Sequence, residues 1–191
     1  MRRKGNTMGP RPHEPEGRDE AMDPMTLMQN RYSCRKFGDD QLTDEELGTI
    51  LEAGRIAPSA CNNQPWRFIV LQSDEDLAKV DGCSRCRYGA KTAILVCFDI
   101  DESAKNPVVT PDYGWIDCGL AIMQMALVAE SLGLGSCIVG AYDPEAARSA
   151  FNIPDNLVTY QFLMLGHPEA GPSKMHGDRR PLGDIVIRGG F

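Results

Sequence analysis

Two short segments carry side chains whose types and spacing suit a planar, negatively charged ligand. The first is Arg31-Tyr-Ser-Cys-Arg35. If this stretch is extended, Arg31, Ser33 and Arg35 project from one side, because strand side chains alternate. Two guanidinium groups and a hydroxyl on one side suit a phosphate or another delocalised anion. Taken alone, the pattern favours surface arginines at a helix end, because matches this short are common by chance.

The second segment is a loop rich in amides, Pro58-Ser-Ala-Cys-Asn-Asn-Gln-Pro-Trp66. Its prolines indicate a rigid connection directly after a predicted helix. Asn62, Asn63 and Gln64 offer both hydrogen-bond donors and acceptors, which could read the heteroatom edge of a planar ring. A polar turn anchored in the core by Trp66 accounts for the same residues equally well.

The elements that must position these segments are predicted from capping signals and hydrophobic periodicity. A capping box at Thr43-Asp-Glu-Glu46 begins a helix that runs to about Arg55. The other predicted elements are strands at 68–71, 92–100, 136–139 and 158–165, and helices after Ser73, over 115–132 and from Asp143. The helix over 115–132 is apolar nearly all round, which predicts burial within its own core or against another subunit. Because helices and strands alternate irregularly, the pattern favours an α+β fold.

Composition and charge exclude several classes of protein. The 191 residues, 42% of them hydrophobic, suit one globular domain. A net charge of −7 argues against a general nucleic-acid binder. The longest apolar stretch, 118–129, is too short to span a membrane. Residues 1–24 are rich in proline, glycine and charge, so we expect a disordered tail before a domain at 25–191.

The seven cysteines, with no secretory signal, are expected to be reduced thiols in a cytoplasmic protein. Cys83-Ser-Arg-Cys86 is a C-x-x-C pattern, which in isolation could be a redox pair or half of a metal site. A zinc or iron–sulfur site needs more ligands, and no second C-x-x-C follows. We therefore expect plain thiols and no metal.

Taken together, the two segments and the motifs after them resemble the nitroreductase family. The order R-x-S-x-R-x-F, a capped helix, then A-P-S-x-x-N-x-Q-P-W-R-F is similar to the opening of that family. The resemblance covers about residues 25–191. Its later anchors are Tyr88-Gly-Ala, Asp117, Gly133 to Gly140 before Asp143-Pro144, Leu165-Gly-His-Pro168 and Arg179-Arg-Pro-Leu182.

The resemblance implies a fold, an assembly and a cofactor site. The fold would be an α+β, three-layer α/β/α sandwich with a mixed, mainly antiparallel sheet, in a domain-swapped type of homodimer with FMN at the interface. The implied FMN-binding residues fall into four groups: Arg31, Tyr32, Ser33 and Arg35 for the phosphate, ribityl chain and pyrimidine end; Pro58, Ser59, Asn62 and Asn63 against the ring; Cys137, Ile138, Val139 and Gly140 near flavin N5 and O4; and Arg179 and Arg180 for the phosphate. Tyr32 departs from the pattern, because many relatives have arginine or histidine there.

The implied activity is electron transfer from NADH or NADPH to a nitroaromatic, a quinone or a similar small acceptor by a ping-pong cycle. The chemistry would belong mainly to the cofactor, so no side chain is expected to be catalytic. Three alternatives remain open: another activity on the same scaffold (flavin reduction, reductive dehalogenation or flavin fragmentation), a flavin-binding redox sensor without turnover, and a thiol oxidoreductase built on Cys83 and Cys86.

Overall fold

The computed structural model describes residues 23–105 and 112–190. The expected tail therefore lies outside the described residues except for Asp23 and Pro24. These two residues begin a helix that the sequence analysis did not predict, α1 (Pro24–Asn30), whose N–H of Thr26 donates to the Asp23 carboxylate at 3.0 Å. An aspartate cap followed by proline is a regular helix start.

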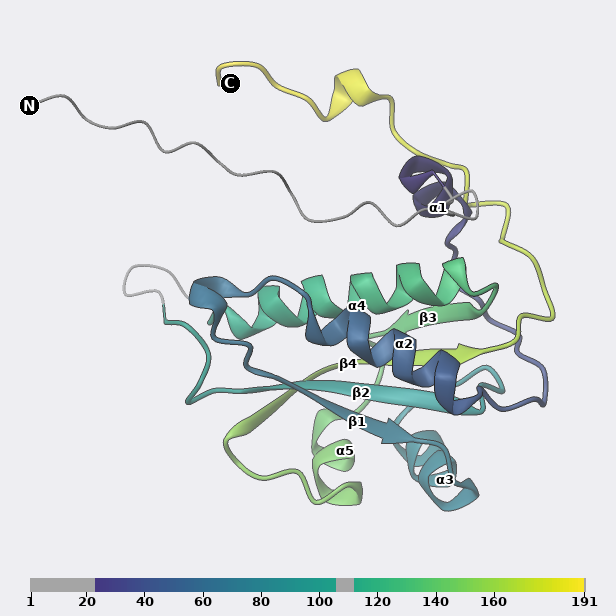
Figure 1. Cartoon of the computed structure of the whole chain (residues 1–191), viewed down its shortest axis with the longest axis vertical. Coiled ribbons are helices and arrows are strands. Elements are labelled where there is room, and N and C mark those ends of the chain that lie inside the picture. Colours follow the sequence, from purple (N-terminus) through teal and green to yellow (C-terminus); the bar gives the residue numbers. More distant parts are fainter. Residues whose placement is uncertain (1–22, 106–111, 191) are drawn as a thin grey trace, which may run out of the picture.

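Four antiparallel strands form the central sheet (Figure 1). In chain order they are β1 (Trp66–Leu71), β2 (Thr92–Asp99), β3 (Gly135–Val139) and β4 (Leu157–Gly166), and in space they run β1-β2-β4-β3. Each neighbouring pair is antiparallel. An isolated bridge between Ser33 and Ser136, at the start of β3, adds a parallel pairing to this sheet. The expected mixed, mainly antiparallel sheet is confirmed.

Helices cover both faces of this sheet and make three layers (Figure 1). On one face lie α2 (Asp44–Arg55) and α4 (Gly114–Ser131), and on the other lie α3 (Asp74–Cys83) and α5 (Pro144–Ala150). Alternate residues of β2 divide between the two cores: Ile94, Val96 and Phe98 pack with α2 and α4, whereas Ala93, Leu95 and Cys97 pack with α3 and α5. β2 is buried along its whole length because it has a helical layer on each side.

The long helix α4 packs on the sheet but keeps an apolar outer face. Eight of its residues are buried, among them Asp117 and Met125. Ile116, Leu120 and Met123 on its other side are each more than 40% exposed. Within one chain, therefore, only one side of α4 is buried, and its exposed apolar side remains available to a partner.

The C-terminal segment 171–190 lies away from the sheet and passes beside α1 (Figure 1). Its one helical turn is η2 (Leu182–Asp184). The large apolar side chains after that turn are exposed: Ile185, Val186 and Ile187. Among the helices within the described ranges, none is long and apolar enough to cross a membrane.

Candidate functional site

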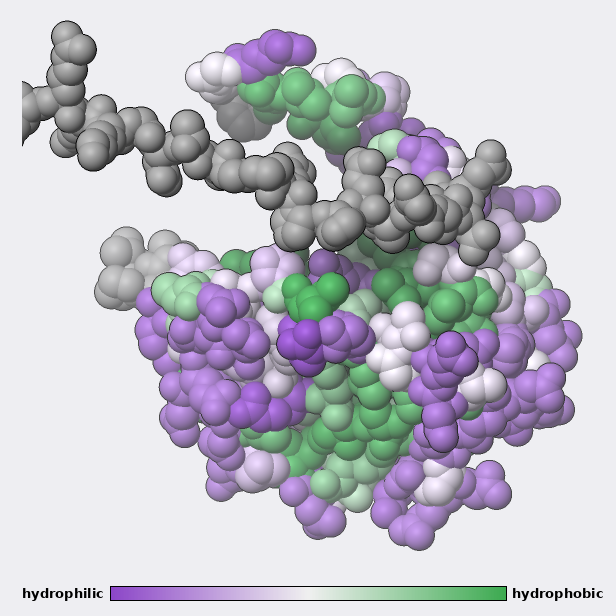
Figure 2. All heavy atoms as spheres, in the orientation of Figure 1, coloured by the Kyte–Doolittle hydropathy of each residue, from purple (hydrophilic) through white to green (hydrophobic). Residues whose placement is uncertain are grey.

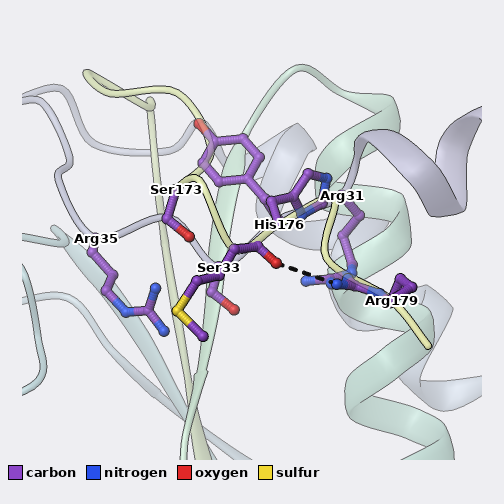
Figure 3. A pocket seen from close by; sticks show the side chains of 8 residues that line it. Arg31, Ser33, Arg35, Ser173, His176 and Arg179 are labelled. Atoms are coloured by element: carbon purple, nitrogen blue, oxygen red, sulfur yellow. Dashed lines mark hydrogen bonds between the residues drawn. The ribbon is translucent and has the colours of Figure 1, made fainter.

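A polar pocket lies where residues 31–35 meet the C-terminal segment (Figure 3). Its cavity measures about 220 Å³. The residues that line it are Arg31, Tyr32, Ser33, Arg35, Ser173, Met175, His176 and Arg179. Five of the sequence-derived candidates (Arg31, Tyr32, Ser33, Arg35 and Arg179) thus share one cavity, which we call the arginine pocket.

Local backbone geometry explains how Arg31, Ser33 and Arg35 come to face the same cavity. Cys34 is fully buried, and its backbone N–H donates to the carbonyl of Ser136 at 2.8 Å. This contact holds the segment extended against the start of β3, so the residues on either side of Cys34 point outward. The approach is close: a Cβ on Gly135 would lie 3.0 Å from the Cys34 side chain.

Tyr32 and His176 hold the C-terminal segment, which forms one side of the arginine pocket, against residues 29–32. The Tyr32 hydroxyl donates to the carbonyl of Ala170 at 2.6 Å. His176 Nε2 lies 2.8 Å from the carbonyl of Gln29, and the two aromatic rings meet edge to face with centroids 6.2 Å apart. The departure from the family pattern at Tyr32 is therefore accommodated by a contact within this chain.

The arginine pocket is positively charged and holds no carboxylate among its lining residues. Of the salt bridges within the described part of the chain, none involves Arg31, Arg35 or Arg179. Arg179 donates instead to the carbonyls of Met175 and Asp178, at 3.4 and 2.8 Å. Three guanidinium groups with no anionic partner among the described residues are equipped to hold a multivalent anion.

Arg35 also makes a hydrogen bond with Tyr88, which packs against the core on the α3 and α5 side of the sheet. A hydrogen bond with the Cys86 thiol raises the pKa of the Tyr88 phenol, as does partial burial, while a hydrogen bond with Arg35 lowers it. Tyr88 has φ +58°, an uncommon conformation for a bulky residue, and such outliers gather at functional sites. The hydrogen bond with the Tyr88 phenol limits the positions that the Arg35 guanidinium can take.

The amide-rich loop 58–64 follows α2 and lies at the N-terminal end of α4 (Figure 1). Its Ala60 N–H donates to the carboxylate of Asp117, in the first turns of α4. The arginine pocket adjoins Ser136, which comes after the last residue of α4. Since 18 helical residues span about 27 Å, the two candidate groups do not meet within one chain.

The candidates on β3 and at the C-terminus occupy separate places. Cys137 and Val139 are buried in the core on the α3 and α5 side, Ile138 is half-buried toward α4, and Gly140 is exposed. Arg179 lines the arginine pocket, but its neighbour Arg180 is exposed and lies outside it. Pro58, Ser59, Asn62 and Asn63 belong to the distant loop.

Sequence reasoning missed three lining residues, Ser173, Met175 and His176. They lie about 140 positions after Arg31, in a segment with no periodicity, so no local signal places them there. The ring of His176 is partly covered, and its Nε2 lies 2.8 Å from the carbonyl of Gln29.

All seven cysteines are free thiols. Cys83 is buried, and burial raises the pKa of its thiol, which disfavours the reactive thiolate. Within the residues that the structure covers, no cluster of three or more histidine, cysteine or acidic side chains could hold a metal ion. Nothing in these positions favours the redox-pair alternative for Cys83 and Cys86.

Comparison with known proteins gives a consistent result. The model of the nitroreductase family matches residues 28–91 and 85–167. A protein of Archaeoglobus fulgidus, provisionally named an NADH dehydrogenase/NAD(P)H nitroreductase, is 35% identical over 172 residues, covering 86% of this chain and 96% of that protein. The crystal structure of a nitroreductase family protein from Clostridium difficile 630 superimposes with a TM-score of 0.84 at 35% identity, covering 89% of this chain and all of the other.

A third relative was crystallised with a cofactor. This structure, of a provisionally named nitroreductase from Desulfovibrio desulfuricans in complex with FMN, has a TM-score of 0.73 at 30% identity and covers 90% of this chain and 99% of the other.

Proposed function

Because the chain belongs to the nitroreductase family, we propose that it is an FMN-dependent oxidoreductase that passes electrons from NADH or NADPH to a nitroaromatic, a quinone or a similar small acceptor. A relative from Vibrio harveyi, 30% identical over 159 residues, is named an NADPH-flavin oxidoreductase. This name and the FMN complex of the structural relative support both the cofactor and the electron donor.

The arginine pocket is the observation that carries the proposal. A flavin mononucleotide ends in a phosphate dianion, and Arg31, Arg35 and Arg179 supply guanidinium groups with no competing carboxylate in the lining. Arginine forks suit the planar, bidentate recognition of phosphate. The hydroxyls of Ser33 and Ser173 in the same lining add uncharged donors. The residues present therefore fit the phosphate end of FMN.

The ring end of the cofactor requires a second subunit. The loop that carries Ser59, Asn62 and Asn63 lies at the other end of α4 from the arginine pocket of the same chain, so each chain has two half-sites. We propose a homodimer in which the arginine pocket of one chain and the loop of its partner hold one FMN. The exposed apolar side chains of α4, Ile116, Leu120 and Met123, are the natural contact between the two chains.

The C-terminal segment supports a domain-swapped form of this dimer. The outer edge of β1 has no paired strand among the described residues, and an apolar groove of about 500 Å³ lies between this edge and α2, lined in part by Leu51, Trp66 and Phe68. Figure 2 shows apolar side chains gathered in this region and, separately, on the C-terminal segment. Residues 185–187 of one chain could add to the β1 edge of the other, which would cover both surfaces.

Bound FMN would supply the hydride chemistry, accepting from NAD(P)H and giving to the acceptor in alternate half-reactions. The residues of the chain would bind the flavin, orient it and polarise its ring. Arg35 would place a positive charge at the pyrimidine end, where it stabilises the negative charge that reduction puts on the ring. The backbone from Ile138 to Gly140 would lie near N5 and O4, and the amides of the loop would contact the ring edge. No described side chain needs to act as a nucleophile or general acid.

We also propose a reducing, cytoplasmic location for this enzyme, because the sequence has seven cysteines, an odd number that fits a closed disulfide framework poorly. Disulfides would be expected to form between neighbouring thiols in an oxidising compartment. Determination of the thiol-to-disulfide ratio in freshly lysed cells tests this part of the proposal.

The visible absorbance spectrum of the purified protein tests the function. We expect a two-banded flavin spectrum that bleaches when NADH or NADPH is added without oxygen and returns when a nitroaromatic or a quinone follows. A colourless protein that also takes up no added FMN would overturn the proposal. A flavin that bleaches but is not reoxidised by any acceptor would instead indicate a redox sensor.

A further inference from the structure

We propose that Asp117 is a positioning residue, which holds the loop 58–64 in the shape that presents its amides to the flavin ring. This inference rests on the proposed function, and no step of the electron transfer assigns a role to Asp117. The residue lies on α4, is 1% exposed, and extends from the helix to the backbone of the loop.

The contact between Asp117 and the loop is specific. The Asp117 Oδ1 accepts the backbone N–H of Ala60 at 2.9 Å, and Oδ2 is buried with no hydrogen-bond partner among the described residues. Burial raises the pKa of the Asp117 carboxyl, and the bond from Ala60 opposes the rise. A buried carboxyl oxygen without a partner costs stability, so the bond that the other oxygen makes to the loop must offset part of that cost.

The helix itself does not need this carboxylate as a cap. The N–H of Gly114, the first residue of α4, already donates to Asp112 at 3.1 Å. Asp117 stands a turn further on, where its own N–H bonds to the carbonyl of Tyr113 within the helix. Its side chain therefore serves the loop.

The loop has a shape that needs to be held. Cys61, Asn62 and Gln64 have φ values of +54°, +57° and +52°, in the left-handed region that non-glycine residues avoid. Strained residues of this kind persist only when surrounding contacts fix them, and they concentrate at ligand clamps.

Hydrogen bonds within the loop and to two other segments fix the strained turn. Inside the loop, the N–H groups of Asn62 and Asn63 donate to the carbonyls of Ser59 and Ala60 at 3.0 and 3.1 Å. The N–H of Gln64 donates to the Ser59 hydroxyl at 2.9 Å, which closes the loop on itself. The Asn63 amide donates to the carbonyl of Glu102 at 2.9 Å. The bond from Ala60 to Asp117 ties the loop to the sheet-packed helix α4, so its loss would loosen the first turn of the loop.

The test combines the amide exchange of Ala60, followed by NMR in the flavin-free protein, with the dissociation constants of FMN and riboflavin. Asp117→Ala removes the acceptor, and Asp117→Asn keeps an oxygen at the same place. Cys118→Ala is the matched control, because Cys118 is the next residue of α4, is fully buried, and directs its thiol to the carbonyl of Cys97 in β2.

In Asp117→Ala we expect Ala60 to exchange at least about tenfold faster and both flavins to bind about tenfold or more weakly, by a similar factor. The factors should be similar because the loop faces the ring, which FMN and riboflavin share. Asp117→Asn should restore binding to within about threefold, and Cys118→Ala should alter neither readout. If Asp117→Ala does not fold, Asp117→Leu keeps the branched shape without an acceptor and should give the same two effects.

Two results would overturn the inference alone: unchanged Ala60 exchange in the variants that lack the acceptor, or faster exchange with unaltered flavin affinity. Failure of Asp117→Asn to restore binding would also count against it. A wild-type protein that binds neither flavin would overturn the proposed function and the inference together, and is thereby distinguished from the other outcomes.

Discussion

Replacement of Arg31 by glutamine should separate the affinity for FMN from that for riboflavin. The side chain of Arg31 lines the arginine pocket, where no carboxylate competes for it. A hydrogen bond to a charged group contributes about 1.5–3 kcal/mol. At about 1.4 kcal/mol for each factor of ten, the dissociation constant of FMN should rise roughly 10- to 150-fold. Riboflavin has no phosphate, so its dissociation constant should change less than about twofold.

Flavin fluorescence, titrated against the flavin-free protein at two salt concentrations, measures both constants. Arg85→Gln is the control, because it removes the same charge from an exposed residue outside the arginine pocket. In Arg31→Gln the FMN affinity should also depend less steeply on salt, since one ionic contact is missing. Equal losses for FMN and riboflavin, or equal losses in the two variants, would refute the assignment of this pocket to the phosphate.

Three further outcomes are expected. Gly114→Ala should destabilise the fold by about 1–3 kcal/mol or more, seen as a lower urea midpoint, because the new methyl group would collide with the ring of Phe98. The backbone N–H of Thr43 donates to the Glu46 carboxylate and holds its pKa below the unfolded value of 4.5. Ionised Glu46 therefore stabilises the fold above that value, and this contribution is lost as the pH falls through the folded pKa. In Glu46→Gln the free energy of unfolding should consequently fall less steeply between about pH 5 and 3. Removal of residues 182–191 should convert the proposed dimer to a monomer in sedimentation, with loss of FMN. A truncated protein that stays dimeric would contradict the domain-swapped form of the dimer.

Much of the fold could be predicted because its signals are local. The capping boxes at Thr43 and Ser73 begin helices in the structure, and both retain their reciprocal hydrogen bonds. The β-rich run beginning at Thr92 is a strand buried along its length. The Asp143-Pro144 pair begins a helix as expected. Each of these signals depends on neighbours within a few residues, which is the information that a single sequence contains.

The parts that escaped prediction depend on contacts between distant segments. Helix α1 has a regular Asp23-Pro24 start, but it adjoins a polar segment whose composition obscured it. His176 lines the arginine pocket only because the chain returns past α1, and no pattern near residue 176 indicates this. Nor does spacing along the chain show that Ser59 and Arg31 lie at opposite ends of α4, because that separation is set by the packing of the helix.

In the proposed homodimer, the separation of the two half-sites along α4 has a genetic consequence. One chain with a defective arginine pocket and another with a defective loop each form homodimers with no intact site. A mixed dimer joins the sound pocket of one chain to the sound loop of the other and so contains one working site and one doubly damaged site. Random assembly of equal amounts would restore about a quarter of all sites. Two inactive alleles could then complement each other in one cell, whereas two alleles damaged in the same half-site could not.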